Sequence, residues 1–537
     1  MNASAPSTVY EIFSVTARKY PDRPVLNVLP GTAEIYDLAP DEVTYADALE
    51  QVDLIARELK AAGYSAGMRV ALLLENRPAF FLYWLAVNSI GGSVVPINPD
   101  LRSAELEYLI GHSEPALIVA IASRHPELET ASKSAGMDVP VIVPGDRLPG
   151  PRRDAVVARP LEGEAREAAI LYTSGTTGKP KGCILPNTYF LLAGHWYANV
   201  GGLANLTDAG ERMITPLPVF HMNAMAYSFM AMVTVGGCLT VLDRFHPRGW
   251  WSDVAASKAT CLHYLGVMPS MLMSFEPSPA DRAHSVRFGF GAGVDPKLQV
   301  AFEERFGFPL VEAWAMTETG AGAVIAASTK DRLVAQASIG KPKAEVECLI
   351  IDDEGTPSER GELLVRRAGS EPRYGFFSEY YKDAAATAEA WEGGWFHTGD
   401  IVRRTPDGNM FFVDRKKNVI RRSGENIAAV EVESILMRHP EIKAAGVAPV
   451  PDPVRGDEVF ACLSVKDATP AKAEAITRWC LDQMAYYKAP GFIAFVDKLP
   501  LTATQKIQRA ALKEMAGRLL HDPDTVATGH LKKRQAG

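Results

Sequence analysis

The sequence predicts an α/β protein with a large N-terminal domain of layered sheets and helices and a small α/β C-terminal domain. The first observation is a length of 537 residues, which exceeds the size of one typical domain. The second is the alternation of short apolar runs with helical patterns along the first part of the chain. The third is a shorter set of strand and helix patterns after residue 430. Such alternation is typical of sheets covered by helices.

Periodicity and punctuation predict the N-terminal elements in order. Thr44 is the expected N-cap of a helix whose apolar residues recur from Ala46 to Leu59, and Gly63 ends it. Pro78 favours a helix start, so a helix is expected over 78–90. Apolar runs predict buried strands over 69–74, 93–97, 117–121, 139–143 and 168–172. An aromatic-rich helix is expected over 188–200.

A string of glycines, hydroxyls and lysines follows the strand predicted at 168–172. Glycines let backbone N–H groups approach an anion, and hydroxyls and lysines add donors and positive charge, so the string suits a polyphosphate. It is not a P-loop, because only two residues separate Gly175 from Gly178 and Pro180 follows Lys179. The plain alternative is a solvated turn. The string comprises Thr173, Ser174, Gly175, Thr176, Thr177, Gly178, Lys179, Pro180, Lys181 and Gly182.

Composition narrows the class of protein. Hydrophobic residues make up 47% and charged residues 22%, which is ordinary for a globular protein, and the net charge of -8 argues against nucleic acid as a partner. The six cysteines form no Cys-x-x-Cys pair, so we expect neither a zinc site nor a disulfide framework. We expect no signal peptide, no membrane span and a cytoplasmic location.

Several further stretches carry polar residues in apolar surroundings, and each alone has a structural explanation. His221, in Pro-Val-Phe-His-Met-Asn, could be a structural histidine. The Thr-Gly-Asp that ends at Asp400 could be a simple turn, and Lys506 could be a surface charge. Asp407-Gly408-Asn409 predicts a hairpin between 402–404 and 410–413. Helices are then expected over 430–439 and 470–484 and strands over 444–450 and 458–465, with a disordered polar tail from His521.

Taken in order, these stretches resemble the signatures of the adenylate-forming superfamily: acyl-CoA synthetases, peptide-synthetase adenylation domains and luciferases. The resemblance runs from Thr44 to Arg509 and is most like bacterial crotonobetaine/carnitine-CoA ligases and medium-chain acyl-CoA ligases. It implies an adenylation domain over 1–416 and a mobile domain over 417–537, with the hinge at Lys417. In two departures, Trp314-Ala315 replaces the usual Tyr-Gly and Gln505 a usual Gly.

The resemblance also implies the substrates ATP and coenzyme A, a small carboxylic acid, and Mg²⁺. The implied phosphate contacts are Thr173, Ser174, Gly175, Thr176, Thr177, Gly178, Lys179 and Thr317. Glu318 would hold Mg²⁺. The implied nucleoside contacts are Gly291, Ala292, Gly293, Trp314, Asp400 and Arg415. The acyl pocket would include His221, Gly293 and Trp314. Gly424 would face the pantetheine arm, and Lys506 would close over the site during adenylation.

The function that the resemblance implies is an ATP-dependent acyl-CoA ligase. An alternative is an enzyme that forms acyl-AMP and passes the acyl group to a carrier protein or an amine. Another alternative is a nucleotide-binding protein without catalysis. The resemblance does not specify which carboxylic acid is the substrate. The small residues 320–323 after Glu318 could leave room for a bulky acid or allow tight helix packing. A homodimer is left open.

Overall fold

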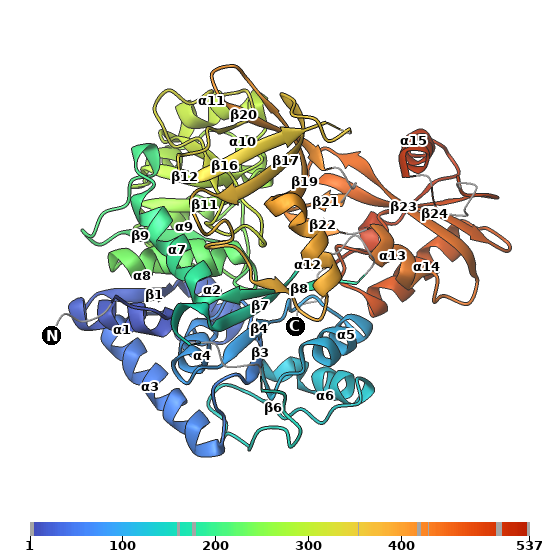
Figure 1. The fold of residues 1–537 in the computed structure, drawn as a ribbon. Coiled ribbons are helices and arrows are strands. Elements are labelled where there is room, and N and C mark those ends of the chain that lie inside the picture. The colour runs from blue at the N-terminus through green and yellow to red at the C-terminus, as the bar shows by residue number, and fades with distance from the viewer. Residues whose placement is uncertain are drawn as a thin grey trace.

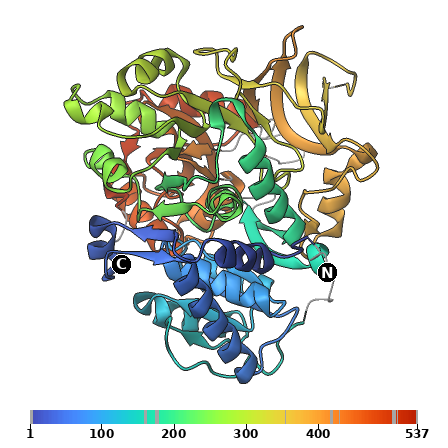
Figure 2. The same cartoon turned by 90° about the vertical axis from the view of Figure 1, so that its left-hand side faces the viewer.

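The computed structural model confirms the α/β class, with a large domain and a small domain beside it (Figure 1). The structure describes residues 5–157, 162–173, 179–352, 354–415, 420–427, 429–500, 507 and 509–533. Figure 2 shows the blue and cyan N-terminal elements as a lower layer and the green and yellow elements above them. No helix among the described residues is long and apolar enough to cross a membrane.

The large domain contains sheets of seven, eight and five strands. In spatial order, the seven-stranded sheet comprises β18 (Glu379–Tyr380), β8 (Lys181–Pro186), β7 (Glu167–Thr173), β4 (Ser93–Pro96), β3 (Arg69–Leu73), β5 (Leu117–Ala120) and β6 (Val141–Ile142). The eight-stranded sheet comprises β14 (Ile325–Ala326), β13 (Leu310–Trp314), β12 (Phe288–Ala292), β11 (Cys261–Leu265), β9 (Arg212–Thr215), β10 (Cys238–Val241), β1 (Pro24–Val28) and β2 (Asp41–Thr44). The five-stranded sheet comprises β15 (Ser338–Gly340), β20 (Met410–Arg415), β19 (Phe396–Arg404), β17 (Arg360–Arg367) and β16 (Val346–Ile351).

The small domain has a six-stranded sheet with helices on both faces. Its strands are β22 (Glu425–Ile427), β21 (Ile420–Arg422), β24 (Gly456–Val465), β25 (Phe492–Phe495), β26 (Val526–Ala527) and β23 (Ile442–Asp452), which pairs with β24. One core lies under α13 (Ala429–Leu436) and α14 (Pro470–Gln483) and the other under α15 (Arg509–Leu519). The predicted boundary residue Lys417 lies outside the described residues, so the domain limits stay a prediction.

The other helices cover the sheets of the large domain. They are α1 (Val9–Lys19), α2 (Pro30–Tyr36), α3 (Tyr45–Ala62), α4 (Pro78–Ser89), α5 (Ser103–Ser113), α6 (His125–Ser134), α7 (Asn187–Asn199), α8 (Met230–Val235), α9 (Trp250–Ala256), α10 (Val267–Met273), α11 (Pro296–Phe306) and α12 (Ala384–Ala390).

Helix α4 shows why the first two sheets stack. Every residue from Phe80 to Asn88 is buried, so the helix has no polar face to turn to solvent. It joins a core that includes Leu72 of the seven-stranded sheet and Leu239 of the eight-stranded sheet. An apolar helix of this kind is stable only with protein on all sides, and the two sheets provide it.

The caps predicted for α3 are present. The Thr44 hydroxyl accepts a hydrogen bond from the Asp47 backbone N–H, and Gly63 ends the helix with φ of 101°. Strand β8 begins at the end of the glycine- and hydroxyl-rich string and pairs antiparallel with β7. No sequence pattern predicted this strand. Thr173 and Lys181 are register partners, so the string joins two antiparallel strands. A P-loop, by contrast, joins a strand to a helix.

The prediction of a disordered tail from His521 is wrong for residues 521–533. Strand β26 pairs with β25, and the buried Lys532 amine donates to the Glu458 carboxylate, which also accepts from Arg422. Tail composition alone could not reveal this, because the buried acidic partner lies 74 positions earlier in the chain.

Lys532→Ala should therefore destabilise the protein. The variant leaves the buried Glu458 with Arg422 as its remaining cationic partner, and breaking a buried pair costs about 3 kcal/mol. We expect a lower calorimetric unfolding temperature for Lys532→Ala, whereas Lys533→Ala, at an exposed neighbour, should melt like the wild type. Equal melting of the two variants would contradict a structural role for the tail.

Candidate active site

The site is built where four neighbouring parallel strands end. Strands β13, β12, β11 and β9 lie side by side and run in the same direction, so their carboxyl ends share one edge of the sheet. Trp314 and Leu265 are the last residues of β13 and β11, Gly293 directly follows β12, and His221 lies beyond β9. Ligands of open α/β sheets bind at such an edge.

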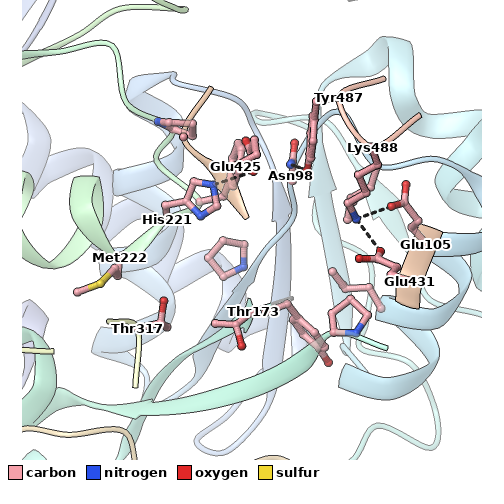
Figure 3. A pocket seen from close by; sticks show the side chains of 18 of the residues that line it. Asn98, Glu105, Thr173, His221, Met222, Thr317, Glu425, Glu431, Tyr487 and Lys488 are labelled. Carbon is pink, nitrogen blue, oxygen red and sulfur yellow. Dashed lines mark hydrogen bonds and ion pairs between the residues drawn. The ribbon is translucent and has the colours of Figure 1, made fainter. Parts of the chain in front are cut away.

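A cavity of about 440 Å³ lies at this edge, between the two domains. Thr173, at the end of β7, brings the neighbouring sheet into its wall (Figure 3). The small domain contributes Tyr487 and Lys488 from the opposite side. Of the sequence-predicted residues, those that line the cavity are Thr173, Lys179, His221, Thr317, Glu318 and Gly424.

The other predicted residues lie elsewhere. The segment 291–293, Trp314 and Asp400 are not in the lining of this cavity, and Arg415 is the strand partner of Asp400 in the β19–β20 pair. Ser174, Gly175, Thr176, Thr177, Gly178, Lys417 and Lys506 lie outside the described residues.

Trp314 and Asp400 form a buried contact between two sheets. The indole N–H of Trp314 donates to Asp400 Oδ2 at 2.8 Å, and the residues are 6% and 2% exposed. Trp314 ends β13 of the eight-stranded sheet, and Asp400 belongs to β19 of the five-stranded sheet. The indole therefore orients the carboxylate that was predicted to be a ribose ligand, a role that the sequence did not indicate.

Glu312 shapes the loop after β12 and was missed at the level of sequence. Its carboxylate accepts from the backbone N–H groups of Gly293, at 2.8 Å, and Val294, at 3.2 Å. The Tyr264 hydroxyl also donates to it, and burial raises the pKa of Glu312. A Cβ at Gly291 would lie 2.1 Å from the Tyr264 carbonyl oxygen, so β12 passes too close to β11 for any side chain there. The small-residue run is therefore needed for packing.

Glu318 presents a carboxylate to the cavity. The Tyr380 hydroxyl donates to Glu318 Oε1 at 3.0 Å, and Glu318 is a buried residue. Burial, together with the adjacent Glu318, raises the pKa of Tyr380 well above its ordinary value, so the phenol stays a donor. No group of three or more His, Cys, Asp or Glu side chains in the described residues could hold a metal by itself. A divalent cation on Glu318 would thus take its other oxygen ligands from substrate and water.

A tight hairpin brings the small domain to the mouth of the cavity. Ser423 and Gly424, with φ of 50° and 89°, form the two-residue turn between β21 and β22, as in a type I′ turn. A Cβ on Gly424 would lie 2.3 Å from Leu265 Cδ1, so another residue would have to displace the leucine side chain as well as adopt the positive φ. Next to it, Glu425 Oε2 lies 3.6 Å from His221 Nε2 (Figure 3).

A buried ion cluster of Lys488, Glu105 and Glu431 joins the domains. Lys488 Nζ lies 2.6 Å from Glu105 Oε1, on α5 of the large domain, and 2.7 Å from Glu431 Oε1 of the small domain (Figure 3). The Ala485 N–H also donates to Glu105, at 2.9 Å. Burial opposes charge on the amine, but the two carboxylates outweigh it and raise the pKa of Lys488. The cluster therefore holds the small domain in this orientation.

Comparison with known proteins gives a family for both domains. The family of AMP-binding enzymes matches residues 13–375, and the AMP-binding enzyme C-terminal domain matches residues 431–506. The crotonobetaine/carnitine–CoA ligase of Salmonella paratyphi A is 30% identical over 492 residues, which cover 88% of this chain and 93% of the relative. The enzyme of the same name from Shigella flexneri is 29% identical over 485 residues, with the same coverage.

Solved structures share the fold over nearly the whole chain. An o-succinylbenzoate CoA synthetase of Bacillus subtilis has a TM-score of 0.79 at 24% identity and covers 96% of this chain and 99% of its own. An amide bond synthetase of Marinactinospora thermotolerans has a TM-score of 0.77 at 25% identity and covers 94% and 99%.

The ion cluster predicts that Glu105→Ala loosens the small domain. The variant removes one of two carboxylates from Lys488 and the acceptor from the Ala485 N–H, and breaking a buried pair costs about 3 kcal/mol. We expect a larger radius of gyration by small-angle X-ray scattering. Glu107→Ala, at an exposed position of the same helix, should scatter like the wild type. Unchanged scattering of Glu105→Ala would show that other contacts hold the domain.

Proposed function

The chain belongs to the family of AMP-binding, adenylate-forming enzymes, and on this basis we propose that it is an ATP-dependent acyl-CoA ligase. It activates a small carboxylic acid as acyl-AMP with release of pyrophosphate, and then transfers the acyl group to coenzyme A with release of AMP. The observation that carries the proposal is that one cavity is lined both by Thr173, Thr317 and Glu318 of the large domain and by the Gly424 turn of the small domain.

The first half-reaction joins two anions. The substrate carboxylate is already ionised, so it attacks the α-phosphorus without a general base, and the bond to pyrophosphate breaks. The chain's contribution is to position the reactants and to offset negative charge. Thr173 and Thr317 line the cavity as hydroxyl donors, and Lys506 would add a cation. Mg²⁺ on Glu318, when bound, would neutralise phosphate charge.

The nucleoside would lie along the ends of β12 and β13. Asp400 offers a carboxylate for the two ribose hydroxyls, since its two oxygens can accept from a vicinal diol. The Trp314 N–H holds that carboxylate in place from 2.8 Å. Glu312 keeps the Gly293 loop in the conformation that leaves backbone next to the purine.

The second half-reaction needs a path for the pantetheine thiol. The Gly424 turn lies at the cavity mouth, where Glu425 Oε2 is 3.6 Å from His221 Nε2, and we expect the pantetheine chain to pass the glycine backbone there. The thiol sulfur attacks the acyl carbonyl, the bond to AMP breaks, and the sulfur loses its proton. Lys506 would have to lie away from the site during this step, because the lysine side chain and the pantetheine arm cannot occupy the same space.

The described residues that flank the segment containing Lys506 support a separate domain orientation for each half-reaction. Leu499 and Ile507, which flank the segment, pack against Leu512 and other residues of the small domain. Neither lines the cavity, whereas Gly424 does. This domain orientation therefore suits thioester formation, and a rotation near Lys417 would produce the orientation for adenylation.

A second candidate is an enzyme that passes the acyl group to an amine or a carrier protein. The observation that favours it is the TM-score of 0.77 to an amide bond synthetase, close to that for the CoA synthetase. The deciding experiment is pyrophosphate release from MgATP across short, medium, aromatic, betaine and steroid-side-chain acids, each with and without CoA. Turnover that requires one class of acid and CoA supports the ligase. A single burst that CoA does not change favours the second candidate, and no release at all favours a binding protein without catalysis.

Lys506→Ala should separate the two half-reactions. Because this lysine is expected at the site only during adenylation, pyrophosphate release should fall by about 10²-fold or more, while thioester formation from supplied acyl-AMP should persist. Lys513→Ala, at an exposed position of α15, is the control and should retain both rates. An equal loss of both half-reactions in Lys506→Ala would contradict two domain orientations.

Trp314→Phe should weaken ATP binding selectively. The variant keeps an aromatic ring but removes the N–H that holds Asp400, and a hydrogen bond to a charged group contributes about 1.5 kcal/mol or more. We expect the KM for ATP to rise about tenfold with little change in the KM for the acid. Trp479→Phe, on α14 of the small domain, should change neither value. A rise confined to the acid KM would instead assign Trp314 to the acyl pocket.

A further inference from the structure

A buried polar relay lies behind the cavity wall next to His221. His263, on β11, is fully buried, and its Nε2 lies 2.9 Å from the Tyr197 hydroxyl of α7. Its Nδ1 lies 2.6 Å from Asn223 Oδ1 and 2.8 Å from Ser228 Oγ. Asn223 lines the cavity and begins a π-helical segment, Asn223–Phe229. Such segments are frequent at functional sites.

The relay determines which nitrogen of His263 carries the proton. The Tyr197 hydroxyl is buried and its pKa is raised well above the ordinary value, so it keeps its proton and needs an acceptor. Nε2 of His263 is the acceptor within reach. Burial also lowers the pKa of His263 to about 3, so the ring is neutral and its one proton lies on Nδ1.

The proton on Nδ1 in turn determines the orientation of the Asn223 amide. Nδ1–H donates to Asn223 Oδ1, since an amide nitrogen there would place two donors against each other. The Ser228 hydroxyl donates to the Asn223 backbone carbonyl, so it does not compete for the amide. The NH₂ group of Asn223 is therefore the end left for the cavity. Among the described residues it has no hydrogen-bond partner, and the side chain is partly exposed there.

The chemistry around this NH₂ group restricts what it can bind. Its neighbours in the lining include the apolar Leu217, Phe220 and Met222. The cationic side chains of the cavity are Lys179, Arg438 and Lys488, and Lys488 is already paired with two carboxylates. A plain alkyl chain next to Asn223 would bury a donor without an acceptor, whereas a neutral oxygen suits both this donor and its apolar neighbours.

We propose that Asn223 is a specificity-determining residue and that the acyl group carries a neutral oxygen acceptor, as a keto, hydroxyl or ether group, which accepts a hydrogen bond from the Asn223 amide. This proposal rests on the proposed acyl-CoA ligase function and names its substrate class as oxygen-substituted carboxylic acids. His263 and Tyr197 act through Asn223 and are positioning residues.

The test compares each saturated acid with its oxo counterparts of equal chain length, in which the oxo group is moved one carbon at a time. The wild type, with MgATP and CoA, should show kcat/KM about tenfold or more higher for one oxo acid than for the saturated acid, the worth of one paired donor. Equal values for every pair would overturn the proposal while leaving the ligase intact. No pyrophosphate release with any acid would overturn the ligase and this inference together.

Two variants of Asn223 distinguish the effect of its N–H donor from the effect of its side-chain shape. Asn223→Asp keeps the bond to His263 but presents an oxygen to the cavity, so the preference for the oxo acid should disappear or reverse while the saturated acid is still used. Asn223→Leu removes both groups and should also abolish the preference. Persistence of the preference in both variants would overturn the assignment.

A further variant tests the relay. Tyr197→Phe removes the hydroxyl that holds the proton of His263 on Nδ1, so the amide should lose its fixed orientation. We expect the oxo preference to weaken with little change for the saturated acid. A uniform loss for both acids would indicate that Tyr197 serves only to pack the core.

Discussion

One buried ammonium group determines how the two domains meet. Lys488 belongs to the small domain, and it lies between Glu431 of the same domain and Glu105 of the large one. A buried charge without its partners costs several kcal/mol, so Glu105 favours this orientation of the small domain. The cavity walls, the Gly424 turn against Leu265 and the approach of Glu425 to His221 all depend on that orientation. The cluster thus couples charge pairing to the geometry of the site.

Within the large domain, the site depends on where strands end. Parallel strands of one sheet deliver Trp314, Gly293 and Leu265 to a common edge, and β7 of the neighbouring sheet delivers Thr173. Contacts between sheets then orient what the strands deliver, as when the Trp314 N–H holds Asp400 of the five-stranded sheet. Side chains that approach a ligand are in this way supported by buried partners, which lowers the reorganisation needed at the moment of reaction.

Local patterns predicted much of this architecture, and the reasons for the failures are physical. The Thr44 cap and the Gly63 terminator act within a few residues of themselves, so they are readable and present. The tail was misjudged because its stability comes from Lys532 and the distant Glu458, which no local pattern connects. Glu312 was overlooked for the same reason, because its carboxylate accepts hydrogen bonds from backbone N–H groups of the loop after β12.

The sequence by itself determined the α/β class and the family, because the periodicity of apolar residues and the order of glycine, hydroxyl and carboxylate motifs can both be recognised along the chain. It also located Thr173, His221, Thr317, Glu318 and Gly424, which line one cavity. Only the tertiary structure decided which end of the Asn223 amide faces the cavity. The orientation of the Asn223 amide follows from a proton on His263, and that proton follows from Tyr197, 66 positions away in the chain. Hydrogen-bond direction of this kind depends on burial and on partners brought together by folding, so no sequence pattern encodes it locally.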